Sequence, residues 1–236
     1  MPPELIRFTE LASTMETAHG RAQDGAVHGT AVVAARQTLG RGTRGRAWSS
    51  ETGGLWLSVI ARPSRTDALE ALSLRVGLAT AAVLELLCPA LPRLGLKWPN
   101  DIVIGGRKLA GILCEARWGN GHCQWIVVGL GINVRNQVPA ELDGVAAAIQ
   151  SWDPAADPTA LAEPVAAAVA LAARGAGPLT PAELQAYALR DALAGARVTE
   201  PVAGTAEGIT DAGALRVRTD AGPVREVLAG VVAVRS

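Results

Sequence analysis

A stretch that combines glycine with arginine carries the strongest chemical signal in this sequence. Residues 37–48 read QTLGRGTRGRAW, and no acidic residue falls between Asp24 and Glu51. Glycine lets backbone N–H groups approach a ligand closely, and arginine supplies a planar fork of donors that fits phosphate or carboxylate. The segment therefore predicts an anion-binding loop. A solvated surface loop or an RNA contact is the plainer interpretation of an Arg-Gly cluster taken alone.

Two further segments are expected to place polar groups beside that loop. Residues 97–101 read KWPND, and Pro99 excludes the helical conformation for Trp98, so Asn100 and Asp101 stand at a rigid corner. Residues 107–113 read RKLAGIL, with Lys108 at the start of an expected strand. Alone, these are ordinarily an Asx turn and a solvent-facing lysine. Together with the loop they predict one pocket in which cations and a rigid corner converge.

The composition limits the class of protein. The chain has 236 residues, of which 49% are hydrophobic and 19% charged, a balance typical of a folded globular protein. Lys+Arg and Asp+Glu are equal at 22 each, which argues against a uniformly basic nucleic-acid binder or membrane-surface protein. The three cysteines and three histidines have no metal-ligand spacing, and no CxxC pair occurs. Without a long apolar run or a signal-peptide centre, we expect a soluble, cytoplasmic protein.

Hydrophobic periodicity and turn residues predict the elements that must position these groups. Expected helices cover 14–24, 69–86 and 157–173, and another follows a capping box at Thr180 and Glu183; Ser13 and Glu16 have the same spacing. Expected strands cover 30–35, 55–61, 94–98, 102–104, 109–116 and 125–128, with tight turns at 105–106 and 119–121 and a further strand through 132–134. Five β-rich pieces near 197–199, 205–209, 215–218, 224–227 and 231–234 predict a small barrel.

The fold class is therefore expected to be α/β (α+β), a mixed β-sheet flanked by helices. We place this domain at 1–192 and a small β domain at 193–236.

Four motifs, in this order, resemble those of the biotin–protein ligases. They are Gly40-Arg41-Gly42-x-x-Gly45-Arg46-x-Trp48, Lys97-Trp98-Pro99-Asn100-Asp101, Lys108-Leu109-Ala110-Gly111-Ile112-Leu113 and Gly129-Leu130-Gly131-Ile132-Asn133. The resemblance covers nearly the whole chain and implies a class II synthetase-like catalytic domain followed by an SH3-like β barrel. It also implies the chemistry. Biotin and ATP, with Mg²⁺, give biotinyl-5′-AMP and pyrophosphate, and a lysine of a biotin carboxyl carrier domain, usually of acetyl-CoA carboxylase, then displaces AMP.

The resemblance also implies roles for individual residues. Biotin binding is expected of Ser13, Thr14, Gln37, Gly40, Arg41, Lys108 and Gly111. ATP binding is expected of Arg44, Arg46, Trp48, Asn100 and Asn133, with magnesium held through the ATP phosphates near Asn100 and Asn133 rather than by the protein alone. The expected catalytic residues are Arg41, Lys108 and Asp101. Arg41 and Lys108 would stabilise the negative charge that develops on the α-phosphate. Asp101 would orient or deprotonate the incoming lysine, and the alternative is that it only stabilises the turn.

Two positions depart from the family pattern, and the function has alternatives. Thr43 stands where many members carry an arginine that helps to retain the adenylate, so we expect leakier retention, and Met15 stands where an asparagine usually follows the Ser-Thr pair.

The nearest alternative is a lipoate–protein ligase or related acyl transferase. A biotin sensor or RNA-binding module is the alternative from another class. Because Ser13 lies so near the start of the chain, we expect no DNA-binding helix-turn-helix before it and no DNA or membrane partner. Monomer and homodimer both stay open.

Overall fold

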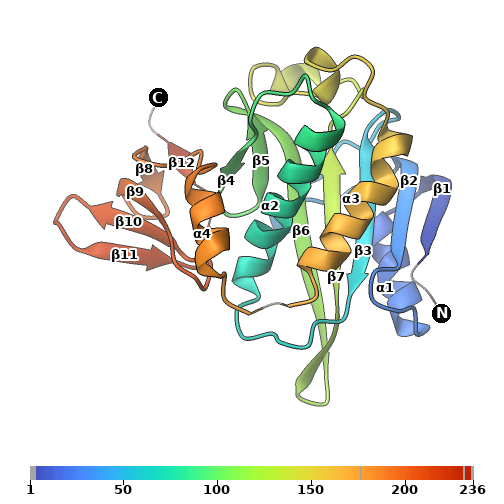
Figure 1. The fold of residues 1–236 in the computed structure, drawn as a ribbon, viewed down its shortest axis with the longest axis horizontal. Helices are drawn as coiled ribbons and strands as arrows, with labels where there is room; N and C mark the ends of the chain where they lie inside the picture. Colours follow the sequence, from blue (N-terminus) through green and yellow to red (C-terminus); the bar gives the residue numbers. More distant parts are fainter. Residues whose placement is uncertain (1–3, 176, 231, 235–236) are drawn as a thin grey trace.

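The structure is a computed structural model that describes residues 4–175, 177–230 and 232–234. It contains a seven-stranded sheet and a five-stranded sheet (Figure 1). The larger sheet has the order β1-β2-β3-β7-β6-β5-β4 and is antiparallel except where β1 pairs with β2. Its strands are β1 (Leu5–Leu11), β2 (Ala31–Gln37), β3 (Leu55–Ala61), β4 (Gly95–Lys97), β5 (Asp101–Ile104), β6 (Arg107–Gly119) and β7 (His122–Ile132). The expected mixed sheet is confirmed.

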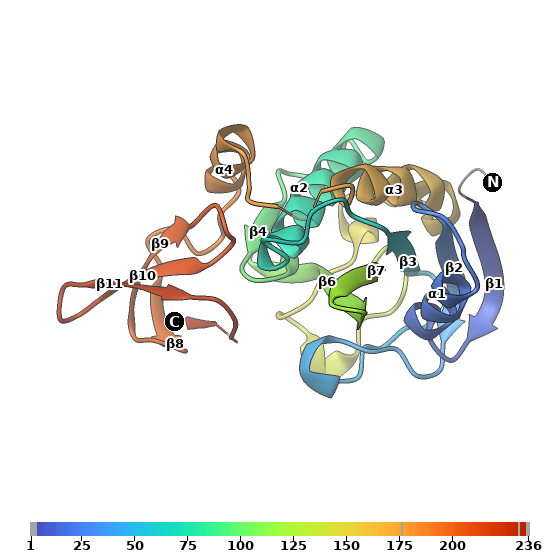
Figure 2. The same cartoon turned by 90° about the horizontal axis from the view of Figure 1, so that it is seen from below.

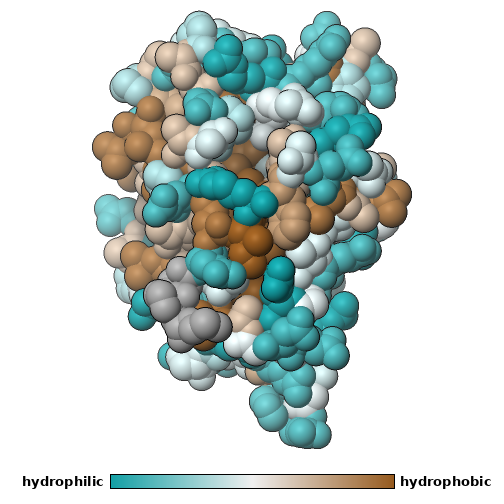
Figure 3. All heavy atoms as spheres, turned by 90° about the vertical axis from the view of Figure 1, so that its right-hand side faces the viewer, coloured by the Kyte–Doolittle hydropathy of each residue, from teal (hydrophilic) through white to brown (hydrophobic). Residues whose placement is uncertain are grey.

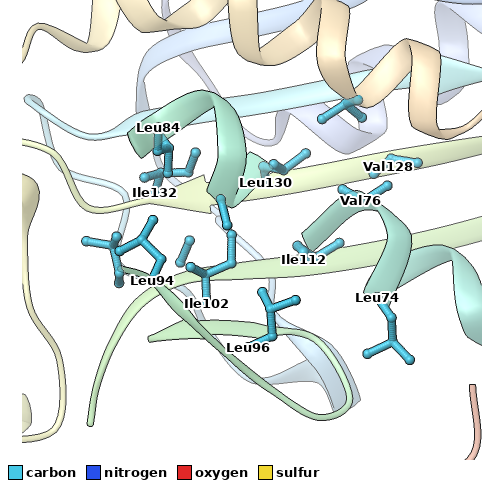
Figure 4. Close-up of a cluster of buried hydrophobic side chains, with 14 of the residues drawn as sticks. Leu74, Val76, Leu84, Leu94, Leu96, Ile102, Ile112, Val128, Leu130 and Ile132 are labelled. Carbon is cyan, nitrogen blue, oxygen red and sulfur yellow. The ribbon is translucent and has the colours of Figure 1, made fainter. Parts of the chain in front are cut away.

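Helices cover both faces of this sheet (Figure 2). α2 (Glu70–Leu87) and α3 (Pro158–Ala172) lie on one face, and α1 (Thr14–Gln23) lies on the other. Because strand side chains alternate between faces, the core has two parts. The larger includes Val76, Ile112 and Leu130 between the sheet and α2 (Figure 4), and the smaller surrounds Met15 beneath α1. α1 packs mainly on β2, β3 and β7 and reaches β6 at Leu113 and Glu115, so it leaves β5 and the start of β6 uncovered on its face.

The C-terminal part begins with α4 (Pro181–Ala188), whose predicted capping box is present. It continues into five antiparallel strands in the order β11-β10-β9-β8-β12. These are β8 (Arg197–Glu200), β9 (Gly204–Ile209), β10 (Leu215–Thr219), β11 (Val224–Val227) and β12 (Ala233–Val234). They correspond to the five expected β-rich pieces, although residue 231 of the last piece lies outside the described residues. The domain boundary at 192/193 stays a prediction.

Several details differ from the sequence prediction. The strand β1 was not predicted, although its exposed charged residues are typical of an edge strand. Figure 3 shows this side of the molecule, where apolar side chains lie among hydrophilic ones. Ser13 is the N-cap of α1, but its side chain makes no capping hydrogen bond, so that capping box is absent. The strand predicted through 132–134 ends at Ile132. The N–H of Asn133 still donates to the carbonyl of Leu109 in β6, but its carbonyl accepts from the N–H of Ile149 outside the sheet.

The two predicted hairpin turns are confirmed. Gly105 and Gly106 have φ of 55° and 77°, and Asn120 and Gly121 have φ of 52° and 79°, as two-residue turns of this kind require. None of the helices in the described ranges combines the length and the apolar character that crossing a bilayer requires.

Candidate active site

A cavity of about 1180 Å³ opens over the uncovered part of the large sheet and reaches the C-terminal sheet. Most of the predicted site residues line it: Ser13, Thr14, Gln37, Arg41, Arg44, Arg46, Trp48, Asn100, Asp101, Lys108 and Gly111. Gly40 and Asn133 do not belong to its lining. Three segments that are distant in sequence therefore meet around one space, as predicted.

A polar network that joins α1, β2 and β3 forms part of the cavity wall. The side-chain carbonyl of Gln37 accepts hydrogen bonds from the N–H and the hydroxyl of Thr14, at 2.8 and 3.0 Å. The Thr14 hydroxyl also lies 2.8 Å from that of Ser58, which is fully buried. The Gln37 amide donates to the hydroxyl of Ser50 at 2.9 Å. These groups are held in place before any ligand arrives.

The sequence interpretation missed Ser58 and Ser50. The available signal for Ser58 was a single hydroxyl in the middle of the apolar strand LWLSVIA. A buried polar group must find a partner, so its position there was informative.

Trp48 lines the cavity and packs closely on the sheet. Gly111 in β6 and Gly131 in β7 are direct cross-strand partners. A Cβ at Gly131 would lie 2.6 Å from the Trp48 indole, and one at Gly111 would lie 3.0 Å from it, so only glycine fits this close approach. The indole N–H is buried and has no acceptor among the described residues. A contact of Trp48 with adenine stays a prediction.

A β-bulge turns Lys108 toward the cavity. Ile102 of β5 pairs with Ala110, but the next residue, Val103, pairs with Lys108, so Leu109 is an extra residue in β6. Leu109 and Ala110 both point into the core. Without the bulge, strict alternation would put Lys108 on the face opposite Gly111. No local sequence pattern indicates this bulge.

The bulge brings the Lys108 ammonium to the rigid corner. Its Nζ lies 2.6 Å from Oδ1 of Asp101 and 5.1 Å from the centre of the Trp48 ring. Asp101 starts β5 directly opposite Gly111. Lys108 and Asp101, which were predicted to be catalytic, therefore form an ion pair beside Trp48.

The Gly-Arg loop carries three further cations along the cavity, and Lys97 of β4 also lines it. Arg44 has φ of 61° in a short turn, Thr43–Gly45, and Arg46 donates to the Thr43 hydroxyl at 3.3 Å. Arg41 lies 3.7 Å from Glu115. Adenylate retention at Thr43 stays a prediction.

Arg36 belongs to the same acid-free stretch, but it does not join the site. It pairs with Glu10 at 2.7 Å and with Glu51 at 3.1 Å. The local positive charge is therefore smaller than the sequence alone suggested.

The two asparagines predicted to lie near ATP and magnesium differ in position. Asn100 lines the cavity, and its amide donates to the carbonyl of Ile112 at 2.7 Å. Asn133 is buried outside the lining, with its amide oxygen accepting from Asn136 at 3.0 Å. This hydrogen bond orders the chain after β7, and contact of Asn133 with nucleotide or magnesium stays a prediction. No cluster of three His, Cys, Asp or Glu side chains suited to a metal occurs in the described ranges. Magnesium held through the ATP phosphates stays a prediction.

The C-terminal sheet also lines the cavity. The resemblance implied that this domain helps to dock ATP or the carrier, and that role stays a prediction. Gly213, Leu228, Val232 and Val234 are among the lining residues. Leu228 is 62% exposed. Residues more than 100 positions apart thus share one wall, and no local pattern reports such a contact.

Comparison with known proteins finds similarity along both parts of the chain. Residues 6–133 match the model of the biotin/lipoate A/B protein ligase family, and residues 196–235 match that of the biotin protein ligase C-terminal domain. The "Bifunctional ligase/repressor BirA" of Bacillus spizizenii is 38% identical over 157 residues, which are 63% of this chain and 47% of that protein. The "Biotin--[acetyl-CoA-carboxylase] ligase" of Paracoccus denitrificans is 40% identical over 105 residues, 44% of this chain and 43% of that protein.

These alignments span about half the length of the two relatives or less. The solved structures extend the similarity. A biotin protein ligase from Aquifex aeolicus in complex with biotin and ATP has a TM-score of 0.82 and 27% identity, with 98% of each chain covered.

Proposed function

Because the chain belongs to the biotin/lipoate A/B protein ligase family, we propose that it activates biotin with ATP as biotinyl-5′-AMP and transfers the biotinyl group to a lysine of a biotin carboxyl carrier domain. The observation that carries this proposal is one cavity lined both by the fixed polar side chains of Thr14 and Gln37 and by Lys108 and the arginines of the loop. A small neutral polar ring and an anionic reacting group would fit these two kinds of lining.

In the first half-reaction, a carboxylate oxygen of biotin attacks the α-phosphorus of magnesium–ATP. A new O–P bond forms, the bond to the bridging α–β oxygen breaks, and pyrophosphate leaves. Carboxylate and triphosphate repel each other, so the reaction needs fixed positive charge where they meet. Arg41 and Lys108 supply that charge, and magnesium bound to the phosphates shields the leaving group.

In the second half-reaction, the ε-amine of the carrier lysine attacks the acyl carbonyl. A C–N bond forms, the C–O bond to phosphate breaks, AMP leaves and the amine loses a proton. Asp101 lines the cavity beside Lys108, a position that supports a role for its carboxylate as the acceptor. When the anionic ligand draws Lys108 away, the carboxylate of Asp101 is left free to orient or deprotonate the incoming amine.

The polar network of Thr14, Gln37 and Ser58 supports biotin over lipoate as the substrate. The ureido ring of biotin carries both N–H donors and a carbonyl acceptor, whereas the dithiolane ring of lipoate has neither. Thr14, Gln37 and Ser58 present hydroxyl and amide groups in a connected network. A site built to pair polar groups discriminates strongly against an analogue that lacks them.

The test is a pair of assays on the full chain. Biotin-dependent exchange of pyrophosphate into ATP reports the first half-reaction, and transfer of labelled biotin to an apo carrier domain reports the second. We expect both with biotin and neither with lipoate. Lack of biotin-dependent exchange would refute the proposal.

A matched pair of variants links the activity to the cavity. Lys108→Met should abolish exchange. The neighbouring Arg107→Met should retain it, because Arg107 stacks on Trp152 at 5.2 Å and does not line the cavity.

A further inference from the structure

Trp98 joins the two sheets beside the active-site corner. Its indole is only 2% exposed, and the ring N–H donates a buried hydrogen bond of 2.9 Å to the carbonyl of Gly213. Gly213 lies in the turn between β9 and β10 of the C-terminal sheet, and both residues line the cavity. A side chain of the KWPND segment is thus held by the other sheet.

The Gly213 carbonyl is itself held in place. The turn closes through the N–H of Thr210, which donates to Ala214 at 2.8 Å, and the N–H of Gly213, which donates to Thr210 at 3.0 Å. Gly213 has φ of +90°, and a Cβ there would lie 2.8 Å from the backbone of Ala71 in α2. The turn is therefore wedged against α2, and its carbonyl forms a fixed acceptor.

The residues on either side of Trp98 are also fixed. The N–H of Leu96 donates to Arg190 at 2.7 Å, and the N–H of Ala192 donates back to Leu96 at 2.9 Å, so the linker extends the edge of the sheet. On the other side, the Ser73 hydroxyl donates to the carbonyl of Pro99 at 2.9 Å. Trp98 supplies the one side-chain hydrogen bond from this corner to the C-terminal sheet among the described residues.

We propose that Trp98 is a positioning residue, through which the turn at Gly213 sets where Asp101 stands relative to Lys108. The inference rests on the proposed function and concerns how the same site is assembled. Asp101 follows Trp98 by three residues and lies 2.6 Å from the Lys108 ammonium. A displacement of about 1 Å in a reacting group is enough to slow a reaction substantially.

This arrangement predicts a separation of kinetic effects. The polar network, made by Thr14, Gln37 and Ser58, belongs to α1, β2 and β3 and makes no hydrogen bond to Trp98. Loss of the Trp98 bond should therefore lower kcat for transfer to the carrier, the half-reaction assigned to Asp101, and leave adenylate formation and the KM for biotin almost unchanged.

The experiment compares two tryptophans with the same kind of bond. Trp98→Phe keeps the aromatic bulk and removes the N–H donor. Trp56→Phe is the matched control, because its indole is equally buried and donates to the carbonyl of Glu51 at 3.0 Å within the same domain and away from the cavity lining. We expect Trp98→Phe to lower kcat for transfer to the carrier by about tenfold or more, with the KM for biotin within about twofold. Trp56→Phe should leave this kcat and the KM for biotin within about twofold. Equal effects of the two variants on kcat would overturn the inference.

A second readout does not depend on activity. Amide hydrogen exchange at residues 100–103 should accelerate in Trp98→Phe and stay unchanged in Trp56→Phe. If the wild-type chain lacks biotin-dependent exchange of pyrophosphate, the proposed function fails, and this readout alone decides the inference. Unchanged protection at 100–103 would then reject it.

A milder variant covers the case in which Trp98→Phe does not fold. The Thr210 hydroxyl accepts from the N–H of Ala214 at 3.0 Å, so Thr210→Val loosens the turn that carries the acceptor. It should raise hydrogen exchange at 100–103, whereas Thr199→Val, which removes a hydroxyl contact with Ala233 in the same sheet, should not. The same exchange in both threonine variants would contradict the inference.

Discussion

The ion pair between Lys108 and Asp101 gives a direct test at the scale of single residues. If Asp101 accepts the proton of the incoming lysine, Asp101→Asn should slow transfer to the carrier by about 10²-fold or more. Adenylate formation should change by no more than about threefold, because Lys108 keeps its charge. Single-turnover measurement of each half-reaction separates the two. Equal loss in both would mean that Asp101 serves only to hold Lys108.

The flat surface made by Gly111 and Gly131 gives a second prediction. In Gly131→Ala the new methyl group would lie 2.6 Å from the Trp48 indole, and overpacking of this kind costs about 1–3 kcal/mol. Trp48 and the loop before it should move, so affinity for biotin should fall by about tenfold. Gly20→Ala in α1 is the control, because nothing lies within 4 Å of a Cβ there. Calorimetric titration with biotin would show equal affinities in the two variants if Trp48 is irrelevant.

The sequence predicted the charged residues of the site better than the neutral ones. Arg41, Asp101 and Lys108 stand in short motifs whose charged residue types indicate an anion-binding or catalytic site. Ser58 sits alone among apolar residues, and the hydrogen bond that makes it informative comes from Thr14, 44 residues away. Polar groups that are paired across the fold leave no local pattern.

At the scale of elements, α1 is tied to the hairpin of β6 and β7 through a buried histidine. The Trp125 indole N–H donates to Nδ1 of His19 at 3.0 Å, so the proton of neutral His19 lies on Nε2, which is 3.1 Å from Glu115. Burial lowers the pKa of His19 below its ordinary value of 6.5, and Arg117 lowers it further, against the raising effect of Glu115.

This pKa shift predicts a pH-dependent stability. The unfolded chain binds a proton near pH 6.5 more readily than the native state does, so stability should fall as pH drops below about 6.5. His19→Gln should reduce that loss, whereas His122→Gln in the exposed turn should not. Urea midpoints at pH 7.5 and 5.5 measure the difference. A wild-type loss identical to that of His19→Gln would show that His19 does not contribute.

Elements with a regular pattern were predictable, and those shaped by neighbours were not. The helix at 69–86 and the strand at 55–61 follow from uninterrupted periodicity and appear as α2 and β3. The edge strand β1 carries charges that hide it from such a search, and the bulge at Leu109 depends on pairing with β5. Tertiary contacts decided both cases.

At the scale of the whole molecule, ion pairs join α2 to the C-terminal part. Arg75 pairs with Glu183 of α4 at 2.6 Å, and Arg190 pairs with Glu85. Arg190, after α4, binds both carboxylate oxygens of Glu85 in α2, at 2.5 and 2.8 Å, and also donates to the carbonyl of Leu94. The Arg190 guanidinium lowers the pKa of Glu85. Both side chains are largely buried, at 12% and 25% exposure, so loss of one partner leaves the other without its counter-charge.

Arg190→Met should therefore lower the free energy of unfolding by about 2 kcal/mol. Arg174→Met, at an exposed position, should change it by less than about 0.5 kcal/mol. Denaturant unfolding measures both. The double variant Glu85→Gln/Arg190→Met should lose less than the sum of the single variants, and strict additivity would mean that the pair is not coupled.

The hydrogen bond from Trp98 to Gly213 also affects how the protein is made, because 115 residues separate donor and acceptor. A ribosome that adds about 5–20 residues per second needs roughly 6–23 s to proceed from one to the other. Thr14, Gln37 and Ser58 precede both of these residues in the chain. The segments that carry the polar network are therefore synthesised well before the turn that accepts the hydrogen bond of Trp98.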